Sequence, residues 1–187
     1  LITFRWNEHD VVFPQYSRTI KGGYNTITSI DMHEKLMPLI GNHVLFDNAI
    51  NYLDNKVAKL DDGTVIEADI VIDAMGNSPS KGITIAYQKF LGIEIELNKT
   101  HNIERPILMD AAVEQIDGYR FMYTLPFSEK KLLVEDTRYS DSSQINEEEY
   151  QAQIMKYLDM KGWQDCKIIK KEKGVLPIIL NGNYSNV

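Results

Sequence analysis

The sequence predicts an α/β region followed by an α+β region, and the first prediction depends on one short segment. This segment, "ADIVIDAMG", contains the continuous apolar run Ile70–Ile72, which is followed by Asp73 and Gly76. A strand that is covered on both faces has this pattern, as in a parallel sheet with helices on either side. Small residues and glycine just beyond the end of such a strand are typical of a cofactor site. We therefore expect Asp73 and Gly76 to lie beside a bound dinucleotide.

The second prediction depends on the remainder of the chain, where strand-like segments surround one amphipathic helix. The helix is expected in "NEEEYQAQIMKYLDMKG", which begins with acidic residues and ends at Lys161-Gly162. One helix on an antiparallel or mixed sheet makes an α+β layer domain. Segment 76–82, which contains "NSPSKG", has the composition of a linker. We expect residues 1–80 to form part of a dinucleotide-binding domain and residues 81–187 to form a sheet domain.

Shorter elements are predicted before residue 80. The segment "VVFPQYSRTIKGGYNTITS" mixes strand and loop, and its two adjacent glycines indicate a turn or a close backbone approach. The segment "SIDMHEKLMPLIG" predicts a short helix that Ser29 or Asp31 caps and that Gly41 ends. Asp62-Gly63 predicts a hairpin turn between two strands.

Composition argues against several classes of function. The 187 residues carry 20 basic and 27 acidic side chains, and the resulting net charge of −7 argues against a nucleic-acid-binding protein. The lysines of "KIIKKEKG" are typical of the solvated side of a strand. The single cysteine, Cys166, excludes an internal disulfide and favours a reducing compartment. The four histidines lack metal-ligand spacing, so no metal site is expected.

Targeting and membrane signals are not visible in the sequence. No apolar run approaches the roughly 20 residues that a membrane-spanning helix needs, and the N-terminus has no signal-peptide pattern. The sequence begins without an initiator methionine, inside what reads as structured sequence. We expect it to be a fragment of a longer protein.

Two adjacent acids stand in the second strand of a predicted hairpin, "YRFMYTLPFSEKKLLVEDTRYS" (119–140). Strand alternation places Glu135 and Asp136 on opposite faces, so they do not form a pair on one face. On a structural interpretation, one acid is solvated and the other pairs with Arg138, Arg120 or a backbone N–H. On a functional interpretation, one acid lies beside an apolar cavity, where desolvation raises its pKa and retains a proton near neutral pH.

Several segments of the chain, in order, resemble bacterial lycopene β-cyclases. They are "AYQKFLG" (86–92), "ERPILMDAAV" (104–113), "DGYRFMYTLPFSEKKLLVEDTRYSD" (117–141) and "GVLPI" (174–178). Upstream, "VVFPQYSRTIKGGYNTITS" and "ADIVIDAMG" are also similar to this family, so the resemblance covers nearly the whole chain. The long third block is specific to the family, whereas many flavoproteins share "ADIVIDAMG".

The resemblance implies a partial flavin-hydroxylase-like fold, in which a Rossmann-like FAD-binding domain (1–80) joins a substrate-binding sheet domain (81–187). It implies FAD in its reduced form, NADPH as the reductant, and lycopene as the substrate. The implied activity is an acid-catalysed, non-redox cyclisation of the linear ends of lycopene to β-ionone rings in carotenoid biosynthesis, by an isomerase or intramolecular lyase. Lycopene dissolves in bilayers, so peripheral contact with the inner, cytoplasmic face of the cell membrane is also implied.

The resemblance also implies that both ends of the family's sequence lie outside this chain. The "GxGxxG" phosphate loop of the family has no counterpart among the eleven glycines. Since a helix N-terminus at that loop binds the pyrophosphate, we expect this piece alone to bind FAD weakly or not at all, and to be inactive.

The resemblance places the proton donor in the "VEDT" motif, which gives Glu135 as the first candidate and Asp136 as the second. Aromatic residues of the same hairpin suit the wall of a polyene site, because aromatic faces stabilise cations; packing in the sheet core is their alternative role. These residues are Tyr119, Phe121, Tyr123 and Tyr139. Two other functions stay open: a different flavoprotein of the same fold, such as an aromatic hydroxylase or a prenyl reductase, and a non-catalytic carotenoid or lipid carrier.

Overall fold

The computed structural model describes residues 1–75 and 83–182, and the chain divides into two compact units. The small unit comprises Leu1 and Thr28–Pro79, and the sheet unit comprises Ile2–Ile27 and Ser80–Val187. We expected residues 1–80 to stay together, but residues 2–27 belong to the sheet unit. The reason is that strand β2 (His9–Phe13) pairs in parallel with β9 (Ile107–Asp110) and so joins the larger sheet.

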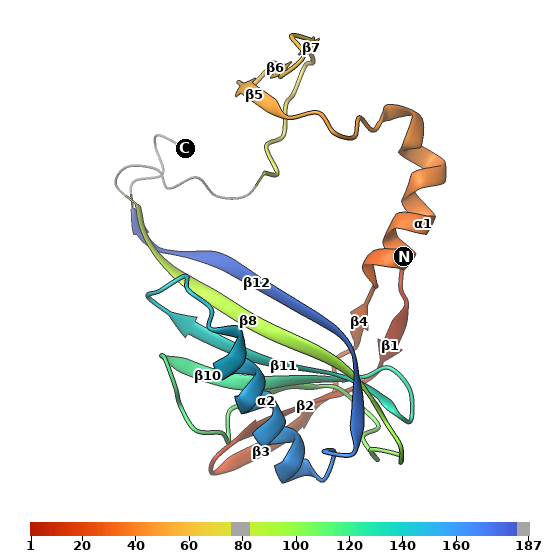
Figure 1. Ribbon diagram of the computed structural model, residues 1–187, viewed down its shortest axis with the longest axis vertical. Helices are drawn as coiled ribbons and strands as arrows, with labels where there is room; N and C mark the ends of the chain where they lie inside the picture. Colours follow the sequence, from red (N-terminus) through yellow and green to blue (C-terminus); the bar gives the residue numbers. More distant parts are fainter. Residues whose placement is uncertain (76–82, 183–187) are drawn as a thin grey trace. The chain divides into compact units, whose positions relative to one another are not determined.

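The sheet unit is built on a seven-stranded mixed sheet (Figure 1). The parallel pair is β2 and β9, and the other neighbouring strands run antiparallel. The spatial order is β12 (Cys166–Gly182), β8 (Ile83–Leu97), β11 (Lys131–Ser140), β10 (Tyr119–Pro126), β9, β2 and β3 (Tyr16–Ile20). Strands β1 (Phe4–Trp6) and β4 (Tyr24–Thr26) form a separate two-stranded sheet in the same unit.

Helix α2 (Glu147–Lys161) lies across one face of the large sheet (Figure 1). The Asn146 side chain caps its N-terminus, and Gly162 ends it in the left-handed conformation at φ 75°. The predicted helix therefore begins and ends where the acidic run and the glycine indicated. Buried apolar residues from β8, β10, β11, α2 and the C-terminal flank of α2 form one core cluster: Leu91, Ile93, Ile95, Leu97, Met122, Leu132, Val134, Tyr150, Ile154, Tyr157, Leu158 and Trp163.

The helix-covered face is the main source of stability in this unit. Ile154 and Leu158 are completely buried on α2, as are Ile93 and Val134 on the sheet. Burying each such side chain contributes roughly 1.5–3 kcal/mol relative to leaving it exposed. The sheet unit can therefore hold charged groups within this face, provided that they are paired.

The small unit contains α1 (Ser29–Ile40), η1 (Gly41–His43) and a three-stranded antiparallel sheet. The strands of this sheet are β5 (Ile50–Leu53), β6 (Val57–Leu60) and β7 (Val65–Glu67). The predicted turn joins β6 to β7, and Gly63 adopts φ 86°. Ser29 and Asp31 were the predicted N-terminal caps of α1, and both are wrong, because the Thr28 hydroxyl accepts the backbone N–H of Asp31 at 3.1 Å; Gly41 is the C-cap, as predicted.

The prediction of a buried parallel strand at "ADIVIDAMG" is wrong for the residues that the structure describes. Residues 68–75 form no strand, and Ile70 and Ile72 are 76% and 85% exposed. A covered strand needs neighbours on both edges and layers on both faces. Here Val71 donates one backbone hydrogen bond to Asn55, at 3.2 Å, and the strand pairing ends before it, at β7.

Candidate acid site on the β10–β11 hairpin

The predicted hairpin forms, and its register separates the two candidate acids. Tyr123 of β10 lies opposite Glu135 of β11, and Met122 lies opposite Asp136. Side chains alternate along each strand, so Glu135 and Asp136 point to opposite sides of the sheet. Asp136 is on the side that α2 covers, together with buried Met122 and Leu91. Glu135 is on the other side.

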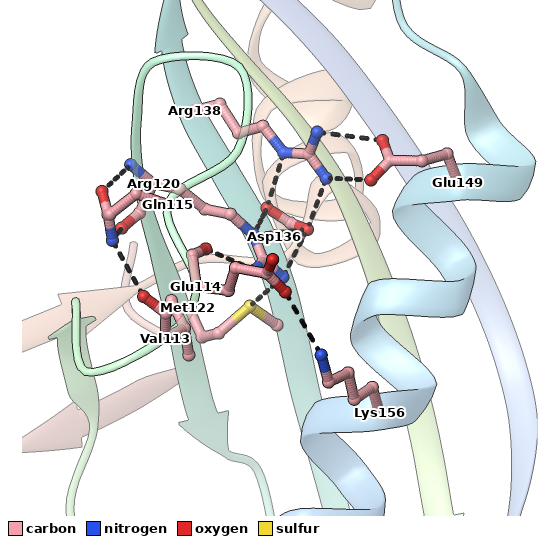
Figure 2. Close-up of polar contacts among 9 residues, drawn as sticks. All are labelled: Val113, Glu114, Gln115, Arg120, Met122, Asp136, Arg138, Glu149 and Lys156. Atoms are coloured by element: carbon pink, nitrogen blue, oxygen red, sulfur yellow. Dashed lines mark hydrogen bonds and ion pairs between the residues drawn. The ribbon is translucent and has the colours of Figure 1, made fainter.

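Asp136 lies in a buried network of charges (Figure 2). The Arg120 Nε atom donates to both Asp136 carboxylate oxygens, at 2.9 and 3.0 Å. Arg138 donates to the same two oxygens through Nε at 3.1 Å and Nη2 at 2.9 Å. Asp136 is 0% exposed, and the two arginines are 2% and 1% exposed. The carboxylate therefore has two guanidinium partners and no contact with water.

The network extends to helix α2 and is neutral overall. Arg138 also donates to both carboxylate oxygens of Glu149, at 2.9 and 3.1 Å, and its guanidinium lies 3.8 Å from the centre of the Tyr150 ring. Two carboxylates and two guanidiniums thus balance in charge. Such pairing is what allows ionised groups to be buried, and it fixes α2 to the hairpin. Hydrogen bonds from the two guanidinium groups thus occupy both carboxylate oxygens of Asp136, the second candidate acid.

Arg120 also holds the loop that precedes β10. Its Nη1 donates to the Glu114 carbonyl at 2.9 Å, and its backbone exchanges two hydrogen bonds with the Gln115 side chain, both at 2.9 Å. Glu114 in turn forms an exposed ion pair with Lys156 of α2, at 3.2 Å (Figure 2). The network thus connects the hairpin, the loop and the helix.

Glu135 has a different environment from that of Asp136. It is half-buried, and among the described residues it makes no ion pair with a lysine, arginine or histidine. The Thr137 hydroxyl donates to its Oε1 at 2.5 Å. Burial first, and then the charge of Glu172, raise the pKa of Glu135 to about 7, while the Thr137 hydrogen bond acts in the opposite direction. A carboxyl group of this kind holds a proton close to neutral pH.

The neighbours of Glu135 lie along one line across four strands. Glu135 on β11 pairs with Tyr123 on the neighbouring strand β10 and with Gly92 on the other neighbouring strand, β8. Gly92 in turn pairs with Glu172 on β12. A Cβ atom at Gly92 would lie 3.2 Å from the Glu172 side chain and 3.6 Å from Glu135 Oε2. Glycine therefore leaves open the space between the two carboxyl groups.

The aromatic residues predicted on the hairpin divide into two groups. Tyr119, Phe121 and Tyr139 contact one another, with ring centres 6.0–6.2 Å apart. Tyr139 also borders a groove of about 730 Å³, beside Ala86, Ile178 and Leu180. Tyr123, which lies nearest to Glu135, joins a different group.

The second group includes aromatic residues that sequence analysis missed. The hydroxyls of Tyr123 and Tyr24 are hydrogen-bonded, and burial followed by this hydrogen bond raises the pKa of Tyr123. From Tyr24 the ring contacts continue through Trp6 and Phe4 to Phe127, with ring centres 6.2, 5.9 and 4.7 Å apart. Pairing of residues about a hundred positions apart leaves no local signal in the sequence.

Of the two residues predicted on the cofactor side, the structure describes Asp73 alone. Asp73 is exposed, and its carboxylate accepts the backbone N–H of Met75 at 2.8 Å, as in a local turn. Gly76 lies outside the described residues. Isoalloxazine and pyrophosphate groups need a concave site with inward-facing donors, whereas residues 70–75 are mostly exposed. These residues therefore do not fit a bound dinucleotide.

The described residues contain neither a metal-binding cluster nor a membrane-spanning helix. Residues 1–75 and 83–182 contain no group of three or more His, Cys, Asp or Glu side chains that could hold a metal ion. Over the same ranges, neither helix has the length and apolar composition needed to cross a bilayer.

A family model and the curated relatives of similar sequence point to the same protein family. A model of the family described as lycopene cyclase protein matches residues 1–187. The chain is 39% identical to a lycopene β-cyclase of a Paracoccus species, over 94% of this chain and 45% of the relative. It is 37% identical to the lycopene β-cyclase of Pantoea ananas, over 98% of this chain and 48% of the relative. The chain thus spans about half the length of the curated relatives that it matches.

A solved structure shares the fold at low sequence identity. A crystal structure of a mutant of P. aeruginosa PqsL matches 89% of this chain and 55% of its own, with a TM-score of 0.53 and 13% identity. At this identity the likeness concerns the arrangement of helices and strands alone.

Proposed function

Because the chain belongs to the lycopene cyclase protein family, we propose that the protein containing it is a lycopene β-cyclase with Glu135 as its proton donor. Such an enzyme is an isomerase, or intramolecular lyase, that closes the linear ends of lycopene into β-ionone rings. The observation that carries the proposal is the environment of Glu135: a half-buried carboxyl with a pKa of about 7 that has no cationic partner in the described part of the chain.

The reaction needs an acid that is protonated near neutral pH and lies beside an apolar substrate. Protonated Glu135 donates to an end double bond of the polyene, so that a C–H bond forms as the O–H bond breaks. A carboxylate and a tertiary carbocation result. A second double bond attacks the cation and closes the ring, and loss of a neighbouring proton to water leaves the ring double bond. Substrate and product contain the same atoms, so no oxidation or reduction occurs.

Several neighbours of Glu135 suit this chemistry. The ring of Tyr123 lies directly across the strand pair, and Tyr24 and Trp6 extend the aromatic surface away from it. Aromatic faces stabilise positive charge through their quadrupoles. We assign Tyr123 to the wall around the cation. Tyr119, Phe121 and Tyr139 are assigned to a more distant part of the polyene, where Tyr139 borders the groove.

The proposal retains the wider features that the resemblance implies. Reduced FAD, with NADPH as its reductant, belongs to the complete protein, but no step is assigned to the flavin because the described residues near Asp73 do not cradle it. For the same reason we infer that this 187-residue chain alone is inactive and binds FAD weakly. The proposal also includes a cytoplasmic location and peripheral contact with the inner face of the membrane in which lycopene dissolves.

Replacing the proposed donor tests the function directly. In the complete protein, Glu135→Gln retains the shape of the side chain but supplies no acid, so ring formation from lycopene should fall at least ~100-fold. Chromatography of the carotenoids formed measures this. Glu96→Gln is the matched control. Glu96 is an exposed acid near the end of β8, on the same face of the sheet as Glu135 and Gly92. Near-normal ring formation by Glu135→Gln would remove Glu135 from the role.

A second measurement separates the cyclase from a hydroxylase or a reductase of similar fold. Ring closure is an isomerisation, so NADPH oxidation should not rise in proportion to the product formed. Product and NADPH are measured in the same reaction. One NADPH consumed per ring would exclude the proposed function.

A further inference from the structure

The carboxyl groups of Glu135 and Glu172 share one face of the sheet although their strands are not neighbours. Strand β8 separates β11 from β12, and Gly92 is the residue of β8 that lies opposite both acids. A side chain at position 92 would occupy the space between them, as the contacts of a Cβ atom there indicate: 3.2 Å to Glu172 Cγ and 3.6 Å to Glu135 Oε2. The Glu135 and Glu172 side chains therefore lie on either side of Gly92, with Leu133 Cδ1 beside them at 3.3 Å from the same Cβ position.

The surroundings of the two acids differ in a way that decides which one holds a proton. Glu135 is half-buried and unpaired among described cations, whereas the Glu172 side chain is 43% exposed and lies 3.6 Å from Lys170 Nζ. Water and Lys170 surround the Glu172 carboxyl group, whereas Glu135 has the hydrogen bond from the Thr137 hydroxyl and no cationic partner in the described part of the chain. Two like charges close together are unfavourable, so the proton is retained by the less solvated group.

The other groups that face Glu135 do not reverse this preference. Tyr123 from β10 is a neutral phenol, and Thr137 from β11 donates one hydrogen bond. Asp136, next along β11, adds negative charge, but it lies on the opposite face between two arginines. Glu172 and Lys170 are the charged groups contributed by β12 on this side.

We propose that Glu172 is a positioning residue for the cyclisation: its negative charge, held across Gly92, favours the protonated form of Glu135. The inference depends on the proposed function. After Glu135 has given its proton to the polyene, the anion faces Glu172, and their repulsion favours transfer of a new proton from water at the exposed edge strand. Glu172 thus acts through Glu135 and does not contact the reacting atoms.

A titration of the Glu135 carboxyl tests this without relying on activity. The complete protein is labelled with 13C at the side-chain carboxyl of glutamate, and the Glu135 signal is assigned as the one lost in Glu135→Gln. The wild-type midpoint is expected near pH 7. Glu172→Gln should lower it by about 0.5–1 pH unit, since an exposed charge acts through a partly screened Coulomb interaction. Lys170→Gln removes the opposite charge and should raise it.

A control variant and the pH–rate profile complete the test. Glu96→Gln removes an acid about 13 Å along β8 from Gly92 and should leave the midpoint in place. Because the protonated acid is the active form, the high-pH limb of ring formation in Glu172→Gln should move to lower pH by the same amount as the midpoint. At pH 7.5 a midpoint lowered by 0.5–1 pH unit corresponds to about a three- to eightfold loss of rate.

The outcomes distinguish this inference from the proposed function. An unchanged Glu135 midpoint in Glu172→Gln overturns the inference, whatever the activity of Glu135→Gln. A shifted midpoint with an unshifted pH–rate profile also overturns the role in the reaction. Full cyclisation by Glu135→Gln refutes the proposed function instead, even if the two carboxyl groups are coupled. Matching shifts in the titration and the rate profile support the inference.

Discussion

The two faces of the β10–β11 hairpin hold adjacent carboxyl groups in opposite ways. On the α2 side, Asp136 is completely buried, and Arg120 and Arg138 balance the charges of Asp136 and Glu149. On the other side, Glu135 is half-buried and its nearest charged neighbour across the sheet is another acid, Glu172. Two adjacent residues of β11 therefore differ in kind: Asp136 is paired with arginines, whereas Glu135 has no cationic partner in the described part of the chain and retains its proton.

The difference teaches that burial alone does not identify a functional acid. Asp136 is the more deeply buried of the two, yet four hydrogen bonds from guanidinium groups occupy its oxygens. Glu135 is less buried but lacks positive charge nearby, so desolvation is not compensated. The absence of a cationic partner, combined with partial burial, distinguishes the acid that can donate a proton.

The largest expected effect on stability comes from removing the buried charge. Asp136→Asn leaves Arg120 with no carboxylate partner and Arg138 with Glu149 alone, so the free energy of unfolding should fall by about 3–5 kcal/mol. Urea unfolding followed by circular dichroism measures this. A loss below about 1 kcal/mol would show that the network does not hold the helix to the sheet.

Removing the ionisable group on the other face, Glu135, should raise the free energy of unfolding at alkaline pH, whereas removing Asp136 lowers it. The folded protein keeps a proton on Glu135 up to about pH 7, whereas an unfolded chain releases it near 4.5. Folded protein therefore binds more protons between these values, and the stability due to Glu135 is lost as pH rises from about 4.5 through 7. Glu135→Gln cannot ionise and should be more stable than wild type at pH 8, by roughly 3 kcal/mol.

Paired unfolding curves of wild type and Glu135→Gln at pH 5 and pH 8 isolate this contribution, because other titrating groups affect both proteins equally. The difference should be small at pH 5 and large at pH 8. Equal differences at the two pH values would contradict the raised pKa of Glu135.

Alternation of side chains along the predicted strand was sufficient to assign the two acids to opposite faces from the sequence alone. It placed Glu135 and Asp136 on opposite sides, and the structural interpretation named Arg138 and Arg120 as partners for one acid; both pair with Asp136. Glu149 could not be foreseen, because sequence predicts that a helix exists but not which strand residues it lies over. Glu172 was interpreted as part of a solvated lysine-rich strand, and only the pairing of β12 with β8 brings it near Glu135.

The small unit shows where local pattern is a poor guide. The run Ile70–Ile72 has the composition of a buried parallel strand, but Ile70 and Ile72 are exposed here. Apolar composition specifies that a segment must be covered and leaves open which strands and helices cover it. In contrast, the Asp62-Gly63 turn depends on four local residues and forms as predicted. Predictions from local chemistry therefore held better than predictions that need distant partners.

A smaller loss of stability is expected from changing Glu149, the partly exposed carboxylate of the buried network. Glu149→Gln keeps a side-chain oxygen as an acceptor for Arg138 but removes the second negative charge, and Asp136 still pairs with Arg138. The free energy of unfolding should fall by about 1–2 kcal/mol, less than for Asp136→Asn. The same urea measurement checks the order of the two variants. A larger loss from Glu149→Gln would place the centre of the network at α2 and not at Asp136.

The smallest effect is expected from the exposed pair that joins the same elements. Lys156 and Glu114 lie 3.2 Å apart, but their side chains are 61% and 64% exposed, so water screens the attraction and the long side chains lose freedom on pairing. Lys156→Met should change the free energy of unfolding by less than about 0.5 kcal/mol, and added salt should reduce this difference from wild type towards zero. Unfolding in low and high salt measures both. A loss comparable to that of Glu149→Gln would mean that the loop at Glu114, and not the buried arginine pair, secures α2 against the hairpin.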